Sequence, residues 1–204
     1  MSMRTFLLPR AVLVLAMMLF SVLPAYAQKG GGAEIKIKKI DFKDQVTPQF
    51  KDSLHGSQGA KERWFRVDVE FDSKSKREWI GELEVRWLVA IETDAGKIAG
   101  LTQSITYLDV EDGRSHNICA YVSPKFFRRF LRSKRIETGR ISTYVEFYVD
   151  GVRVAREEKH SSKMPNNWYN NLDKMQAFPN TLLPRSKTPF APMDFDYFEF
   201  EKTN

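Results

Sequence analysis

The sequence predicts an all-β domain: an antiparallel β-sandwich of about seven strands, with one short helix and a long aromatic C-terminal extension. Three observations lead to this prediction. Apolar and polar residues alternate along seven segments, as they do in half-buried strands. Turns that contain glycine separate several of these segments. The chain has a single cysteine, so an intrachain disulfide is impossible and stability must come from a hydrophobic core.

The first residues have the pattern of a secretory signal peptide. Two arginines precede the apolar run 11–23, and Ala25-Tyr26-Ala27 provides small residues for cleavage. The run is too short to span a bilayer; an uncleaved N-terminal anchor is the alternative. We therefore expect a signal peptide over 1–27, a flexible leader over 28–33, and an exported protein that is periplasmic, surface-located or secreted.

The alternating segments place the sandwich within residues 34–160. In the first segment the doubled Lys38-Lys39 shifts the alternation, as a β-bulge does. In the third, Trp87 points toward the expected core, while Leu88 and Ala90 make the second half apolar on both faces. The predicted strands are 34–42, 63–71, 81–91, 101–110, 116–122, 140–149 and 152–157.

Three connections have the chemistry of hairpin turns: Asp94-Ala95-Gly96, Glu111-Asp112-Gly113 and Asp150-Gly151. Short antiparallel strands with such turns favour a sandwich of immunoglobulin type. The usual cysteine pair between its sheets is missing, so the topology is at most immunoglobulin-like. A β-barrel is the alternative.

The stretch SPKFFRRFLRSKR, residues 123–135, predicts a short helix over 123–133. Ser123 suits the N-cap and Pro124 the first helical position. One side of the helix carries Phe126, Phe127, Phe130 and Leu131, and the other carries Lys125, Arg128, Arg129 and Arg132. We expect this helix to cross from the fifth strand to the sixth and to close one open end of the sandwich. A membrane-surface or nucleic-acid helix would share the pattern.

The C-terminal extension, residues 161–204, does not have the composition of a disordered tail. Four prolines within 178–193 indicate extended or irregular backbone, but the segment is rich in aromatic residues, which disordered tails lack. We expect it to wrap its own sandwich; pairing with a neighbouring subunit by strand addition is the alternative. The candidate protein interface consists of Phe195, Tyr197, Phe198 and Phe200, together with Arg128, Arg129 and Arg132.

Residues that could carry chemistry are few and scattered. His55, His116 and His160 lie far apart and form no metal-binding or catalytic motif, and Cys119 has the setting of a buried small side chain. The acidic pairs Asp109/Glu111 and Asp194/Asp196 fit a turn and the polar face of a strand, respectively. We therefore expect no catalytic, cofactor or metal site. An enzyme would require the fold to bring His116 or the Asp194/Asp196 pair to other groups.

Two tryptophans suggest a different alternative. Trp64 and Trp79 fall near strand ends, where exposed rings could stack on sugars in a carbohydrate-binding module. Packing at the edge of the core is the ordinary role of tryptophan at such positions.

Together, the signal peptide, the strands WIGELEVRWLVAI and RISTYVEFYVDGVRVARE and the aromatic tail carry a family resemblance. Over residues 33–160 the chain resembles small exported Ig-like proteins of Verrucomicrobia-type bacteria, some encoded alongside type IV pilus genes. The resemblance implies a non-enzymatic envelope or pilus-associated protein that self-assembles. The chain lacks a prepilin leader, which argues against a polymerising pilin subunit, and no functional residues carry over.

The predicted function is therefore a protein-interaction or structural domain of the cell surface, an oligomer that contacts itself or other envelope or pilus proteins. The formal net charge of +6 includes two arginines of the signal peptide, so the remaining chain is only mildly basic and nucleic acid is not expected as a partner. We expect no integral membrane span after signal cleavage.

Overall fold

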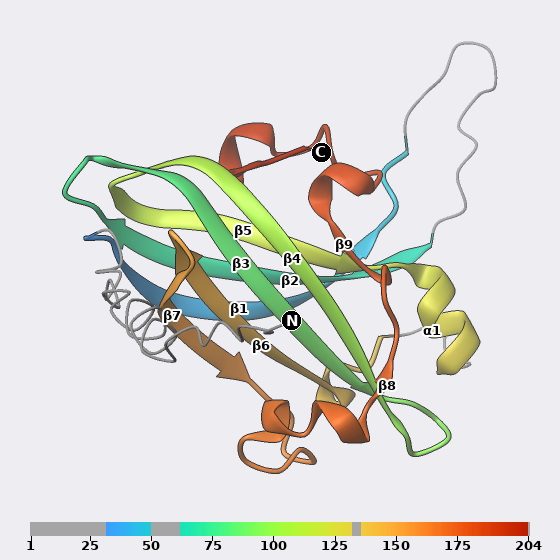
Figure 1. Ribbon diagram of the computed structural model, residues 1–204. Helices are drawn as coiled ribbons and strands as arrows, with labels where there is room; N and C mark the ends of the chain where they lie inside the picture. The colour runs from blue at the N-terminus through green and yellow to red at the C-terminus, as the bar shows by residue number, and fades with distance from the viewer. Residues whose placement is uncertain (1–31, 50–61, 132–135, 204) are drawn as a thin grey trace, which may run out of the picture.

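The computed structural model describes residues 32–49, 62–131 and 136–203 (Figure 1). The predicted signal peptide, most of the leader, His55 and Arg132 lie outside these residues. Seven long strands dominate the fold, and the predicted all-β sandwich is confirmed. They are β1 (Glu34–Val46), β2 (Arg63–Lys74), β3 (Trp79–Glu92), β4 (Ile98–Glu111), β5 (Gly113–Val122), β6 (Ile141–Val149) and β7 (Val152–Lys159).

The strands form two sheets, each extended by short strands of the C-terminal extension. The sheet orders are β1-β2-β5-β9 and β10-β4-β3-β6-β7, and the long strands pair antiparallel throughout. The register of β1 against β2 shifts between Ile37 and Lys39, which confirms the predicted bulge. The short strands are β8 (Gln176–Ala177), β9 (Leu182–Pro184) and β10 (Phe200–Glu201).

The hydrophobic core lies between the two sheets and is built from the inward-facing residues of their strands. Trp87 is 2% exposed at its centre, as predicted. Phe71 and Phe147 contact each other across the sheets with ring centroids 5.2 Å apart. Large fully buried core side chains include Phe65, Phe71, Leu83, Trp87, Ile91, Leu101, Tyr107, Ile118 and Phe147.

One of the three predicted hairpin turns is wrong. Asp150 and Gly151 both have positive φ (50° and 74°) and join β6 to β7 in a hairpin, as expected. The segment Glu111–Gly113 instead carries the chain from one sheet to the other, and β4 and β5 do not pair within the described chain. The Ser73 hydroxyl on β2 bonds to the Glu111 carbonyl at 2.5 Å and accepts from the Gly113 amide at 3.2 Å. This side chain holds the connection as a corner.

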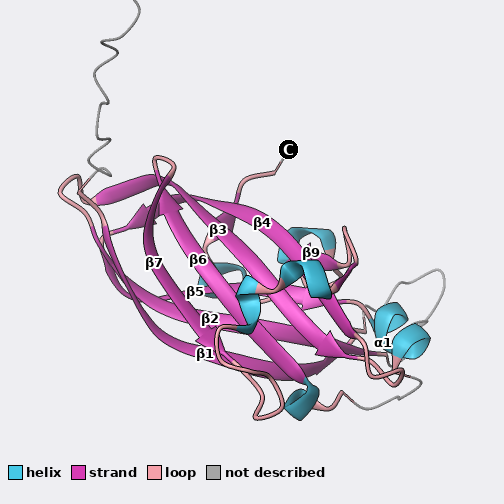
Figure 2. Cartoon of the chain, turned by 60° about the horizontal axis from the view of Figure 1, so that its bottom comes forward, coloured by secondary structure: helices cyan, strands magenta, loops and turns pink. Residues whose placement is uncertain are grey.

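The predicted crossover helix is present but shorter than expected. It is α1 (Pro124–Phe130), and it connects β5 in one sheet to β6 in the other. Ser123 occupies the N-cap position, but its hydroxyl makes no capping hydrogen bond among the described residues. Phe126 and Phe127 are buried, and Figure 2 shows α1 at one end of the two sheets. The role predicted for the helix, closing that end, is confirmed.

The C-terminal extension folds back on its own sandwich. β9 pairs with β5, β10 pairs with β4, and β8 lies parallel to β4, so the extension adds to both sheets on the same side of the sandwich. Its remaining elements are single 3₁₀ turns: η2 (Trp168–Asn170), η3 (Leu172–Lys174), η4 (Arg185–Lys187) and η5 (Phe195–Tyr197); a further turn, η1 (Thr138–Arg140), precedes β6. In the described chain the extension therefore packs on its own domain.

The extension also covers apolar residues on the outer faces of both sheets. Trp168 and Met164 pack on Leu88 and Ala90, which explains why the second half of β3 is apolar on both faces. On the other sheet, Phe190 and Phe198 cover Cys119 and Tyr121 of β5. Each outer face therefore has its own small apolar cluster.

The described residues contain neither a membrane-spanning helix nor a cluster of metal-ligating side chains. No helix there is long and apolar enough to cross a membrane. No group of three or more histidine, cysteine or acidic side chains there is placed to hold a metal ion.

Candidate binding surfaces

Three exposed aromatic side chains lie close together in the sequence near the C-terminus, and we call them the C-terminal aromatic patch: Phe195, Tyr197 and Phe200. Their exposed fractions are 50%, 54% and 56%. The rings of Phe195 and Phe200 meet edge to face, with centroids 5.0 Å apart. Clustered exposed aromatic side chains are typical of contact surfaces. These three residues belong to the interface predicted from the sequence.

The fourth predicted member, Phe198, belongs to the fold. It is 6% exposed and packs with Phe190 over β5, and the guanidinium groups of Arg66 and Arg185 lie 5.3 and 5.4 Å from its ring. The strand predicted for this segment is also wrong outside β10. Asp194 has a positive φ of 50° and starts the 3₁₀ turn η5, so the chain does not alternate as a strand would.

Polar contacts fix the backbone on both sides of the patch. The Glu201 carboxylate accepts hydrogen bonds from the amides of Arg185 and Ser186, both at 2.8 Å. The Arg185 guanidinium donates to the carbonyls of Ala191 and Met193. These bonds tie one part of the extension to another. The resulting frame holds the backbone that carries the aromatic patch.

His116 connects this frame to the sheet. Its Nδ1 lies 2.8 Å from a Glu199 carboxylate oxygen, its Nε2 lies 3.0 Å from Ser73 Oγ, and its ring stacks on Phe71. No motif spacing connects these residues, because 83 positions separate His116 from Glu199. We call the set of Ser73, His116 and Glu199 the histidine latch.

The histidine latch has the order of groups found in a serine–histidine–carboxylate triad, but its serine is not arranged as a nucleophile. A nucleophilic serine gives its proton to the histidine. The Ser73 hydroxyl has one proton, and the Glu111 carbonyl, which can only accept, lies 2.5 Å away. Ser73 is also only 5% exposed. The geometry therefore suits a structural connection between β2, the β4–β5 corner and the extension.

The remaining candidate chemical groups have structural settings as well. Burial raises the pKa of the Cys119 thiol far above its ordinary value, so the reactive thiolate is disfavoured. Asp109, within β4, and Asp194, at the start of the turn η5, both have a positive φ of 50°. Both are positions where short polar side chains tolerate left-handed backbone.

The structure separates the predicted arginines of α1 from the aromatic patch. β10 pairs with β4 near the β4–β5 corner, whereas α1 follows the opposite end of β5. Arg128 is exposed and forms an ion pair with Glu62; Arg129 is exposed and lies over the Phe130 ring at 5.1 Å. The arginines therefore form a second surface at the closed end of the sandwich.

Trp64 and Trp79 also lie apart, at opposite ends of the sandwich. Trp64 contacts the rings of Tyr121 and Phe190, and its Nε1 donates to Thr47 Oγ1 at 3.1 Å. Trp79 is 48% exposed and lines a separate cavity of about 550 Å³. Only Trp79 presents a largely free ring, so the two tryptophans do not form one site.

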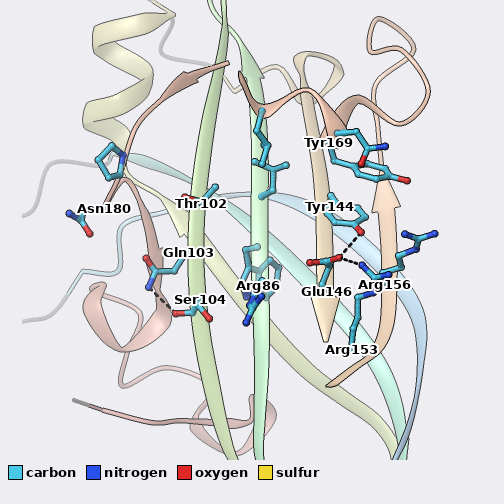
Figure 3. Close-up of a pocket in the computed structure, with 15 residues that line it drawn as sticks. Arg86, Thr102, Gln103, Ser104, Tyr144, Glu146, Arg153, Arg156, Tyr169 and Asn180 are labelled. Atoms are coloured by element: carbon cyan, nitrogen blue, oxygen red, sulfur yellow. Dashed lines mark hydrogen bonds and ion pairs between the residues drawn. The ribbon is translucent and has the colours of Figure 1, made fainter. Parts of the chain in front are cut away.

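A larger groove, absent from the sequence-based candidates, crosses the outer face of the β4-β3-β6-β7 sheet (Figure 3). It has a volume of about 660 Å³. We call it the outer-face groove. It is lined by Arg86, Trp87, Leu88, Thr102, Gln103, Ser104, Tyr144, Glu146, Arg153 and Arg156 of the strands and by Tyr169, Asn170, Leu172, Pro179 and Asn180 of the extension. The hairpin sequence YVEFYVDGVRVAR holds four of these residues at its outward positions, but the contribution of the extension has no sequence signal.

Glu146 is the polar centre of this groove. Its carboxylate accepts hydrogen bonds from the hydroxyls of Tyr144 and Tyr148, both at 2.9 Å, and from Arg153 at 2.6 Å. Burial opposes its ionisation, but the three donors outweigh that effect and lower the pKa of Glu146. The carboxylate is therefore held charged, and its oxygens are committed to protein donors.

Comparisons with known proteins agree with this fold. A protein-family model matches residues 26–204. The chain belongs to the family that this model describes. No curated protein matches the chain. Among solved structures, the crystal structure of a protein from Akkermansia muciniphila is similar, with a TM-score of 0.71 and 16% identity over 84% of this chain and 94% of that one. At this identity the likeness shows the fold. That organism is a Verrucomicrobium, the bacterial group of the proteins that the sequence resembles.

Proposed function

We propose that this protein is an exported, non-enzymatic interaction domain of the cell envelope that self-associates through the C-terminal aromatic patch. The observation that carries the proposal is the exposure of three large aromatic side chains on a backbone fixed by its own polar contacts. Aromatic residues are enriched at the centres of protein interfaces because they bury much apolar surface for little lost conformational freedom. A second copy, carrying the same patch, is the partner that fits.

The open edges of the sheets argue against self-association by strand addition. They therefore favour contact through the aromatic patch. On the side away from the extension, β1 and β7 each pair with one neighbour within the described residues. β1 is lysine-rich and bulged, and β7 has a register shift against β6. Lysines and bulges protect sheet edges against pairing with other chains. The lysines of β1 are Lys36, Lys38, Lys39 and Lys43.

The strand order supports the immunoglobulin-like class proposed for the sandwich. The first, second and fifth strands share one sheet, and the third, sixth and seventh share the other, as in immunoglobulin domains. The fourth strand differs from the constant-type arrangement, because β4 pairs with β3. Domains with this topology bind many different molecules, so the topology does not by itself identify a partner.

The cellular setting belongs to the same proposal. The predicted signal peptide supports export, and the family resemblance supports association with a pilus or other surface assembly. The arginine surface on α1 would then steer acidic envelope partners toward the domain.

The proposal is tested by the mass of the protein in solution. We expect the exported chain to form an oligomer by light scattering, and Phe195→Ser combined with Tyr197→Ser and Phe200→Ser to reduce it to a monomer. Trp79→Ser removes an equally exposed aromatic side chain elsewhere and should leave the mass unchanged. Deleting residues 187–204 is less informative, because it would also remove the buried Phe190 and Phe198.

Two results would contradict self-association through the patch. One is a monomeric wild-type protein at every concentration tested. The other is a triple variant that keeps the oligomeric mass and a cooperative unfolding transition.

A further inference from the structure

We propose that the outer-face groove binds an acidic saccharide, a hydroxyl-rich ligand with a carboxylate or sulfate group. The groove and the aromatic patch share no residues, and the proposal is independent of self-association. It is also a different site from Trp64 and Trp79, the two tryptophans that the sequence suggests as sugar contacts.

The groove is assembled from two distant parts of the chain. Its floor is the outer face of β3, β4 and β6, and residues 169–180 of the extension build up around it. Tyr169 of the extension stacks on Tyr144 of β6, with ring centroids 4.0 Å apart and planes 11° from parallel. Trp168, buried beneath, fixes this part of the extension on β3. The volume of about 660 Å³ lies in the range of small-molecule sites.

The charges lining the groove favour an anion. Three arginines line the groove, Arg86, Arg153 and Arg156, beside one acidic lining residue, Glu146. Arg153 pairs with Glu146, and Arg86 pairs with Glu84 beside the groove, so Arg156 is the lining arginine that no carboxylate of the described residues neutralises. Arginine presents several N–H donors in a plane that matches carboxylate and sulfate oxygens.

The arginines are also held in position before a ligand arrives. The Arg86 guanidinium lies 4.0 Å from the centre of the Tyr148 ring, and its Nε donates to Glu84 at 2.7 Å. Arg156 interacts with the Tyr144 hydroxyl. Side chains fixed in this way lose little conformational freedom on binding.

The uncharged side of the groove favours a saccharide over a peptide. Figure 3 shows Arg86 between the aromatic and charged side chains of β6 and β7 and a group of hydroxyl and amide side chains, Thr102, Gln103, Ser104 and Asn180. Such groups both donate and accept, as sugar hydroxyls do. The groove crosses the face of a sheet, where the backbone is already paired, so it offers no edge for an extended peptide.

The test uses ligands that share one neutral core. Isothermal titration of the full exported chain should detect 3′-sialyllactose and 3′-sulfolactose, with lactose bound at least about tenfold more weakly. Arg156→Gln should weaken both acidic ligands by about tenfold or more, the effect of losing one charge-assisted hydrogen bond. Arg114→Gln makes the same change at an exposed arginine of β5, far from the groove, and should have no effect.

Several outcomes would overturn the proposal. Lactose binding as tightly as the acidic ligands would remove the role of the arginines, and unchanged binding by Arg156→Gln would place the site elsewhere. Sodium sulfate alone binding as well as 3′-sulfolactose would leave no role for the sugar. Tighter binding of a tetra-aspartate peptide would assign the groove to an acidic peptide. Failure of all these ligands to bind would also refute it.

Discussion

At the scale of single residues, His116 connects parts of the chain that the sequence gives no reason to join. Its two ring nitrogens reach Ser73 on β2 and Glu199 on the extension, and its ring lies on Phe71 of the core. From the sequence, His116 is a candidate functional residue only if the fold brings other groups to it. Other groups do meet it, in a partly buried arrangement that holds the extension beside the β4–β5 corner.

The histidine latch predicts a specific loss of stability. His116→Ala removes both contacts and leaves the Glu199 carboxylate without its partner, so the free energy of unfolding should fall by about 1–3 kcal/mol. Urea denaturation followed by tryptophan fluorescence measures the change. His160→Ala alters an exposed histidine and serves as the control.

A second readout separates local release from general weakening. Cys119 lies under Phe198 of the extension and is 1% exposed. A loosened extension in His116→Ala should therefore speed thiol labelling under native conditions. Unchanged stability together with unchanged labelling would show that the latch contributes nothing.

At the scale of elements, alternation was a sufficient guide for the seven long strands. Each predicted segment overlaps its strand, because a strand with one buried face must repeat every two residues. The helix α1 was equally readable from Pro124 and its phenylalanines. The long strands and α1 depend on residues that are neighbours in the sequence. Their patterns can therefore be recognised in a single sequence.

The elements that could not be predicted depend on distant partners. The corner at Glu111–Gly113 has hairpin composition, yet the Ser73 hydroxyl, 38 residues before Glu111, holds it between sheets. The inward turn of Phe198 depends on the apolar surface of β5 beneath it. The outer-face groove likewise exists only where the extension meets the sheet.

The cover that the extension provides for β3 gives a prediction at this scale. Trp168 is 1% exposed over Leu88 and Ala90, so Trp168→Ala should lower the free energy of unfolding by about 3 kcal/mol or more, through lost burial and the cavity left behind. Chemical denaturation measures the loss. Trp79→Ala, at an exposed tryptophan, should cost much less, and equal costs for the two variants would contradict the packing described for the extension.

At the scale of the whole molecule, the extension converts a plain sandwich into a domain with two distinct surfaces. It closes the side formed by β4 and β5 (Figure 1), presents the C-terminal aromatic patch near one end, and helps to form the outer-face groove over β3, β4 and β6. The opposite side keeps lysine-rich and irregular edges. This asymmetry supports a domain that meets other molecules through its extension.

The central claim, that two copies meet at the aromatic patch, is tested most directly by the distance between spin labels. Cys119 is buried, so Asp196→Cys adds an exposed labelling site beside the patch, and Ser162→Cys adds one at the start of the extension, away from the patch. In the oligomer, pulsed dipolar spectroscopy should give a clearly shorter inter-label distance for Asp196→Cys than for Ser162→Cys. An oligomer with no measurable coupling between the Asp196→Cys labels would contradict the account.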